Sequence, residues 1–159
     1  IVNGSGFDAD VVAGKADALR SQLGTGRFHE FDGSAYASTF IPAMELTAVA
    51  YEADPQVGEA VALEVRELTF ERGVDVADPA VLADLAHRHG IDAPDPADRT
   101  RVEADLAEGS ERGVVGSPHF FVAGVDAFCP ALDIDSGDAG LQVSVARNGL
   151  ESLLLTAFG

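Results

Sequence analysis

Apolar positions recur at helical spacing over the first part of the chain. Ala16, Leu19 and Leu23 lie three or four residues apart, which is the period of one helix face. An acidic residue ahead of this stripe, Asp8 or Asp10, can accept hydrogen bonds from free N–H groups at a helix start. The pattern therefore predicts a first helix that ends before the glycine-rich residues 24–26.

Three Asp-Pro pairs punctuate the middle of the chain. They begin at Asp54, Asp78 and Asp95. In such a pair the Asp can cap a helix, and the proline at the first helical position loses no hydrogen bond. We expect helices at residues 42–52, 55–72, 79–89 and 96–108, and Phe28 and Phe31 as anchors of the irregular segment before them.

The pattern changes to short alternating segments after residue 113. His119–Val122 is aromatic and β-branched, which is typical of a strand. With a turn at residues 123–126, a return strand at 127–129 pairs Phe120 with Cys129. We expect a polar loop over 133–140, a strand over 141–145 and a final helix from Asn148 or Gly149. An isolated two-stranded hairpin is only marginally stable in water, so we expect this one to join a larger sheet.

Composition narrows the possible functions. The 159 residues are 47% hydrophobic and carry a net charge of −17, which suits one packed domain or one small domain with an insertion. This charge repels phosphate backbones and anionic lipid surfaces, so we expect no nucleic-acid or membrane partner. The single cysteine, Cys129, excludes an internal disulfide and a multi-thiolate metal site. We expect neither a metal nor a cofactor.

The run GVVGSPHFFV at residues 113–122 carries a resemblance to a known family. It is similar to the cis-proline loop and following strand of DsbA-like proteins in the thioredoxin superfamily, including FrnE-like oxidoreductases and relatives of 2-hydroxychromene-2-carboxylate isomerase. Residues 63–82 resemble the helical insertion of that branch. The resemblance implies an α/β, thioredoxin-like fold with an inserted α-helical domain. Residues 1–33 and 113–159 would form the thioredoxin-like part, and residues 34–112 the insertion.

One feature of that family is missing from the sequence. Family members place a Cys-x-x-Cys, or a variant of it, at the start of a helix after the first strand, and this sequence has no such motif. Two explanations stay open: the sequence begins after the motif, as its start at Ile1 favours, or it is a degenerate member without thiol-disulfide chemistry. No signal peptide is recognisable, and we expect a cytoplasmic location.

The resemblance also suggests site residues. A cis bond before Pro118 would let Ser117 hydrogen-bond an extended substrate, and His119 would point either towards the substrate groove or into a polar part of the core. The predicted register places Cys129 at the same end of the hairpin. Its neighbours Phe128 and Pro130 are apolar and no Lys or Arg lies close in sequence, so we expect a structural, slowly reacting thiol, with a redox role as the alternative.

Two functions follow from these expectations. The first is a DsbA/FrnE-like thiol-disulfide oxidoreductase, or a related thiol-dependent enzyme, that acts on a peptide disulfide, a small thiol or another small molecule. The second is a non-catalytic thioredoxin-like binding module that has lost its redox cysteines and holds a ligand beside Pro118.

Overall fold

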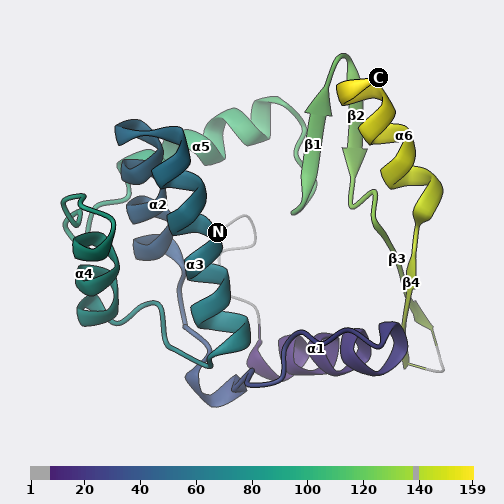
Figure 1. Ribbon diagram of the computed structural model, residues 1–159, viewed down its shortest axis with the longest axis horizontal. Helices are drawn as coiled ribbons and strands as arrows, with labels where there is room; N and C mark the ends of the chain where they lie inside the picture. Colours follow the sequence, from purple (N-terminus) through teal and green to yellow (C-terminus); the bar gives the residue numbers. More distant parts are fainter. Residues whose placement is uncertain (1–7, 138–139) are drawn as a thin grey trace. The chain divides into compact units, whose positions relative to one another are not determined.

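The computed structural model describes residues 8–137 and 140–159 (Figure 1). Most of these residues lie in helices and short strands, which follow one another as α1 (Ala9–Leu23), a 3-10 turn (Gly33–Ala35), α2 (Ile41–Ala53), α3 (Pro55–Glu71), α4 (Pro79–Arg88), α5 (Thr100–Glu111), β1 (His119–Val122), β2 (Val125–Phe128), β3 (Leu132–Gly137), β4 (Gly140–Val145) and α6 (Arg147–Phe158).

The described residues divide into two compact units. Those up to Ala16, together with Arg27–Glu108, form the first, which we call the helical unit. Asp17–Gly26 and Gly109–Gly159 form the second, which we call the hairpin unit. The mixture of helices and strands confirms the α/β class.

The helical unit is built on the packing of α2 against α3, with α4 beside α2. Asp54 ends α2 and begins α3, and its side chain accepts a hydrogen bond from the Gln56 N–H at 2.7 Å. A Cβ at Gly58 would lie 2.3 Å from the Tyr51 ring, so only glycine lets the two helices come this close beyond the turn. The predicted start at the first Asp-Pro pair is confirmed.

The core of this unit is aliphatic. Side chains from α2, α3, α4 and the segment between α3 and α4 are removed from solvent and form one cluster, which includes Leu46, Val61, Val76, Leu82 and Leu85. Phe28 and Phe31 pack their rings on Phe70 of α3 with centroid distances of 6.0 and 5.9 Å. The predicted anchors of the segment before α2 are therefore confirmed.

The predicted start of α5 is wrong. Asp95 accepts a hydrogen bond from the Ala97 N–H, but the chain makes only a turn there. The helix begins at Thr100, whose N–H donates to the Asp98 carboxylate at 2.9 Å. A second carboxylate, that of Glu45 on α2, accepts from the Val102 N–H at 2.8 Å. Acceptors at Asp98 and Glu45 therefore determine where this helix begins, not the Asp-Pro pair.

The hairpin unit contains two separate antiparallel pairs, β1 with β2 and β3 with β4. The register of the first pair differs from the prediction, because Phe120 lies opposite Ala127 and not Cys129. The turn is only Ala123-Gly124, with φ angles of 47° and 82°. Two left-handed residues match the natural strand twist, which favours this tighter turn.

Two further expectations for this region are wrong. Among the described residues the β1–β2 hairpin joins no larger sheet. Most of the predicted polar loop at 133–140 belongs to β3, which pairs with β4. The predicted strand at 141–145 and the final helix are confirmed as β4 and α6.

Gln22 of α1 covers an edge of β4. Its amide NH₂ donates to the Leu141 carbonyl at 2.8 Å, and its amide oxygen accepts from the Val143 N–H at 2.7 Å. Backbone groups two residues apart on one strand are the pair that a neighbouring strand would bond. One side chain thus takes the place of a strand at this edge.

Candidate functional site

The candidate site begins at the loop before β1. The Ser117–Pro118 peptide bond is cis. The Cys129 N–H donates to the Pro118 carbonyl at 2.9 Å, which ties the end of β2 to the loop. Cys129 therefore lies at the same end of the hairpin as Pro118, as the sequence predicts, although the predicted pairing partner is wrong. Ser117 and Pro118 are both exposed.

The loop also packs against β2 through Gly116. A Cβ at this position would lie 2.8 Å from the Phe128 ring, so a side chain here would displace the ring. The absence of a side chain lets the aromatic ring lie directly on the loop backbone. The backbone around Ser117 and Pro118 is held by two contacts with the end of β2, at Phe128 and at Cys129.

His119 packs inward on one face of the hairpin. Its side chain is only 4% exposed and stacks on Phe121, with ring centroids 4.6 Å apart. Its Nδ1 accepts from the Val115 N–H at 3.3 Å, so Nε2 carries the proton in the neutral ring and donates to the Asp126 carboxylate. Of the two orientations that the sequence allows, the side chain takes the one towards polar and aromatic partners.

Cys129 borders an open cavity of about 530 Å³ within the hairpin unit. The thiol residue is half-buried, and its backbone is left-handed, with φ of 45°. The rest of the cavity wall comes from the two neighbours of Cys129, from one residue each of β3 and β4, and from the start of α6. These residues are Phe128, Pro130, Asp133, Val145, Ala146, Arg147, Asn148 and Gly149. A small molecule bound in this cavity would lie beside the one cysteine of the chain.

The start of α6 supplies the second polar element of this cavity. Ala146 occupies the N-cap position and makes no side-chain hydrogen bond to the helix. The first N–H groups of a helix have no intrahelical acceptor and favour nearby anionic groups. Sequence reasoning missed this part of the site. The local sequence carries no signal for it, because Ala146 has no side chain that could cap the helix, whereas Ser, Thr, Asp or Asn is usual at that position.

Comparison with family models shows a match to the DSBA-like thioredoxin domain over residues 25–141. The chain belongs to the DSBA-like thioredoxin domain family. The match includes the cis-proline loop, the β1–β2 hairpin and Cys129. Comparisons with the curated proteins and with the solved structures found no match.

Two further observations describe the thiol content and the helices of this DSBA-like chain. Its 159 residues contain one cysteine, so they hold no Cys-x-x-Cys pair. Within residues 8–137 and 140–159, no helix combines the length and the apolar character that a bilayer crossing requires.

Proposed function

We propose that this protein carries out thiol–disulfide exchange on an extended peptide disulfide or a small thiol compound bound along Ser117, Pro118 and the backbone of His119, whose side chain is buried on the hairpin. The observation that carries the proposal is the hydrogen bond from the Cys129 N–H to the Pro118 carbonyl, at 2.9 Å. It keeps the thiol residue next to the loop at which the family resemblance places the substrate. Membership of the DSBA-like thioredoxin family supports the same chemistry.

The exchange would need only one protein cysteine. The Cys129 thiolate attacks one sulfur of the substrate disulfide, a new S–S bond forms to Cys129, and the second substrate sulfur leaves as a thiolate. A small thiol from solution then attacks the mixed disulfide and releases Cys129 as a thiolate again. The cavity beside Cys129 has room for such a thiol, and the open start of α6 favours its anionic group.

The remaining features of the proposal come from the resemblance. Residues 34–112 would act as an inserted helical domain that limits the size of the substrate. Residues 1–33 and 113–159 would form the thioredoxin-like part. We expect the protein to act in the cytoplasm, with no bound cofactor.

The test measures formation of a mixed disulfide. The full chain is incubated with oxidised glutathione at neutral pH, and intact mass follows the adduct in the native and the denatured protein. We expect the native protein to react at least as fast as the denatured chain and Cys129→Ser to form no adduct. A native protein that reacts much more slowly would show that Cys129 is a structural thiol.

The second candidate is a non-catalytic binding module that uses the same loop. The absence of a Cys-x-x-Cys pair from residues 1–159 is compatible with it, because a module that only binds its ligand needs no thiol. Here a peptide would bind native protein and Cys129→Ser with equal affinity, and no mixed disulfide would form. Fluorescence titration with an extended peptide, alongside the mass measurement, separates the two functions.

A further inference from the structure

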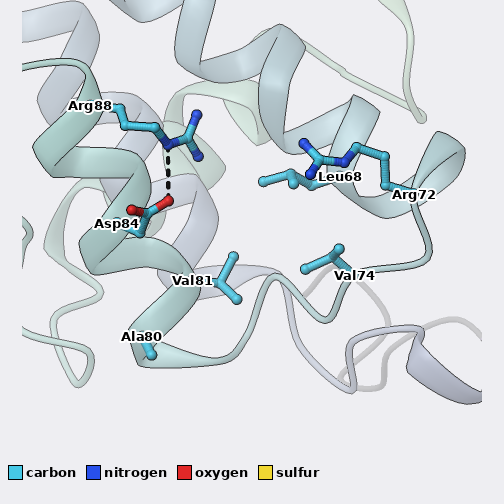
Figure 2. Close-up of a pocket in the computed structure, with 7 residues that line it drawn as sticks. All are labelled: Leu68, Arg72, Val74, Ala80, Val81, Asp84 and Arg88. Carbon is cyan, nitrogen blue, oxygen red and sulfur yellow. Dashed lines mark hydrogen bonds and ion pairs between the residues drawn. The ribbon is translucent and has the colours of Figure 1, made fainter.

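A second cavity lies entirely within the helical unit, between α3 and α4. Its volume is about 560 Å³, within the range of small-molecule sites. Leu68, Val74, Ala80 and Val81 supply apolar wall, and Arg72, Asp84 and Arg88 supply the polar groups (Figure 2). The site therefore offers an apolar surface with charges at one side.

Arg72 is the distinctive group of this cavity. It follows α3 as its C-cap residue, and Figure 2 shows its guanidinium reaching over Leu68 towards the wall that Arg88 lines. No hydrogen bond or ion pair joins this guanidinium to any residue in 8–137 or 140–159. Its donors are therefore available to a ligand.

The other two charged side chains in the cavity, those of Arg88 and Asp84, are already paired. Arg88 Nε donates to the Asp84 carboxylate at 2.9 Å, and its Nη1 contacts Glu64. The uncommitted charge that faces the cavity is therefore the single positive charge of Arg72. This is notable in a chain with 27 acidic and only 10 basic side chains, whose net charge otherwise repels anions.

We propose that this cavity binds a monoanionic carboxylate with an apolar body, of the size of a medium-chain fatty acid. The planar guanidinium of Arg72 pairs with the carboxylate through two parallel N–H···O bonds. The apolar body covers Val74, Val81 and the exposed part of Leu68. A dianionic phosphate fits less well, because one free guanidinium leaves a negative charge uncompensated in the field of a strongly acidic chain.

The site does not depend on the proposed exchange chemistry. Its lining residues run from Leu68 to Arg88, and none of them belongs to the cis-proline loop or the hairpin unit. Loss of Cys129 reactivity would leave carboxylate binding intact. Loss of carboxylate binding would likewise leave the reactivity of Cys129 unchanged.

The test is an NMR titration of the isotope-labelled full chain with octanoate. We expect saturable shifts confined to amides in residues 68–88, and much weaker binding of acetate and of the neutral isostere octanamide. Arg72→Gln should weaken octanoate binding about tenfold, the effect of losing a charge-assisted contact in a partly exposed site. Arg66→Gln, on α3, removes the same charge outside the cavity and should leave the affinity unchanged.

A second variant addresses the apolar wall. Val81→Thr keeps the shape of the side chain but makes it polar, and it should weaken octanoate several-fold without affecting acetate. Equal affinity for octanoate and octanamide, equal effects of Arg72→Gln and Arg66→Gln, or shifts that spread without saturation would each overturn the proposal.

Discussion

Individual charged residues in this protein are stabilised by specific partners, and Glu45 shows this most clearly. Its side chain is fully buried on α2. One carboxylate oxygen accepts from the Val102 N–H, while the other has no hydrogen-bond partner among the described residues and lies 3.6 Å from Arg101. Burying a carboxylate without partners costs folding free energy. For Glu45 this cost is offset by its hydrogen bond at the start of α5 and by its ion pair with Arg101.

Removing this carboxylate should therefore destabilise the helical unit. We expect Glu45→Ala to lower the free energy of unfolding by about 2–3 kcal/mol, because it leaves the Val102 N–H buried without an acceptor and opens a cavity. Glu45→Gln keeps the accepting oxygen and should cost about 1 kcal/mol or less. Urea denaturation gives both values. The exposed Glu59→Ala on α3 serves as the control, and an equal effect of all three changes would contradict this role for Glu45.

Glu64 gives a pH-dependent prediction. Burial alone would raise the pKa of its carboxyl, but hydrogen bonds from His89 and Arg88 outweigh this and hold the pKa below the ordinary 4.5. A lowered folded-state pKa contributes stability above the unfolded-state value, and this contribution is lost as the pH falls through the folded-state pKa. The stability advantage of wild type over Glu64→Gln should thus shrink between about pH 6 and about pH 3. Glu67→Gln on the same helix should show no such trend; a constant advantage over Glu64→Gln would refute the prediction.

Among the elements, α4 has the clearest start. Asp78 accepts a hydrogen bond from the Ala80 N–H at 2.8 Å, and Pro79 occupies the first position of the helix. Asp78→Ala should lower the free energy of unfolding by about 1 kcal/mol, the usual value of an N-cap. Thermal or urea unfolding measures the change. Asp92→Ala, at an exposed position after α4 that caps no helix, should have little effect, and an equal loss in both variants would show that the cap does not contribute.

The same elements show what the sequence can predict. The starts of α3 and α4 depend on contacts within three residues of Asp54 and Asp78, so the local pattern predicts them correctly. The start of α5 depends in part on Glu45, more than fifty residues earlier, and no local pattern contains that information. The segment of β3 reads as a loop because Asp133 and Asp135 are polar. Their alternation with Leu132 and Ile134 also fits a strand, and its pairing with β4 decides for the strand.

The candidate site likewise has features that the local sequence predicts and features that depend on distant parts of the chain. A hairpin between Pro118 and Cys129 brings its two ends together whatever the exact register, so this proximity is predictable from sequence. The cavity at the start of α6 depends on the path of the chain through β3 and β4, which sequence periodicity does not give. The inward position of His119 depends on a stacked ring and on a carboxylate across the hairpin.

At the scale of the whole molecule, the excess of acidic side chains affects the stability of the folded chain. A net charge of −17 on 159 residues places many carboxylates within mutual reach, and their repulsion favours the unfolded chain. Raising NaCl from low concentration to about 0.5 M screens this repulsion, so the melting temperature should rise. Differential scanning calorimetry at fixed neutral pH tests this. A fall in melting temperature would mean that attractive ion pairs, such as those of Arg88 and Arg101, outweigh the repulsion.

The Gln22 side chain also has a consequence for self-association. It occupies backbone groups at Leu141 and Val143 that would otherwise be open to a strand of another molecule. Strand edges that lack such protection are sites of aggregation, and Ile134 and Val145 of the β3–β4 pair add exposed apolar surface nearby. Gln22→Ala should therefore increase light scattering and thioflavin fluorescence on prolonged incubation, whereas Gln56→Ala should not. In this sense one amide acts as a solubility determinant of the chain.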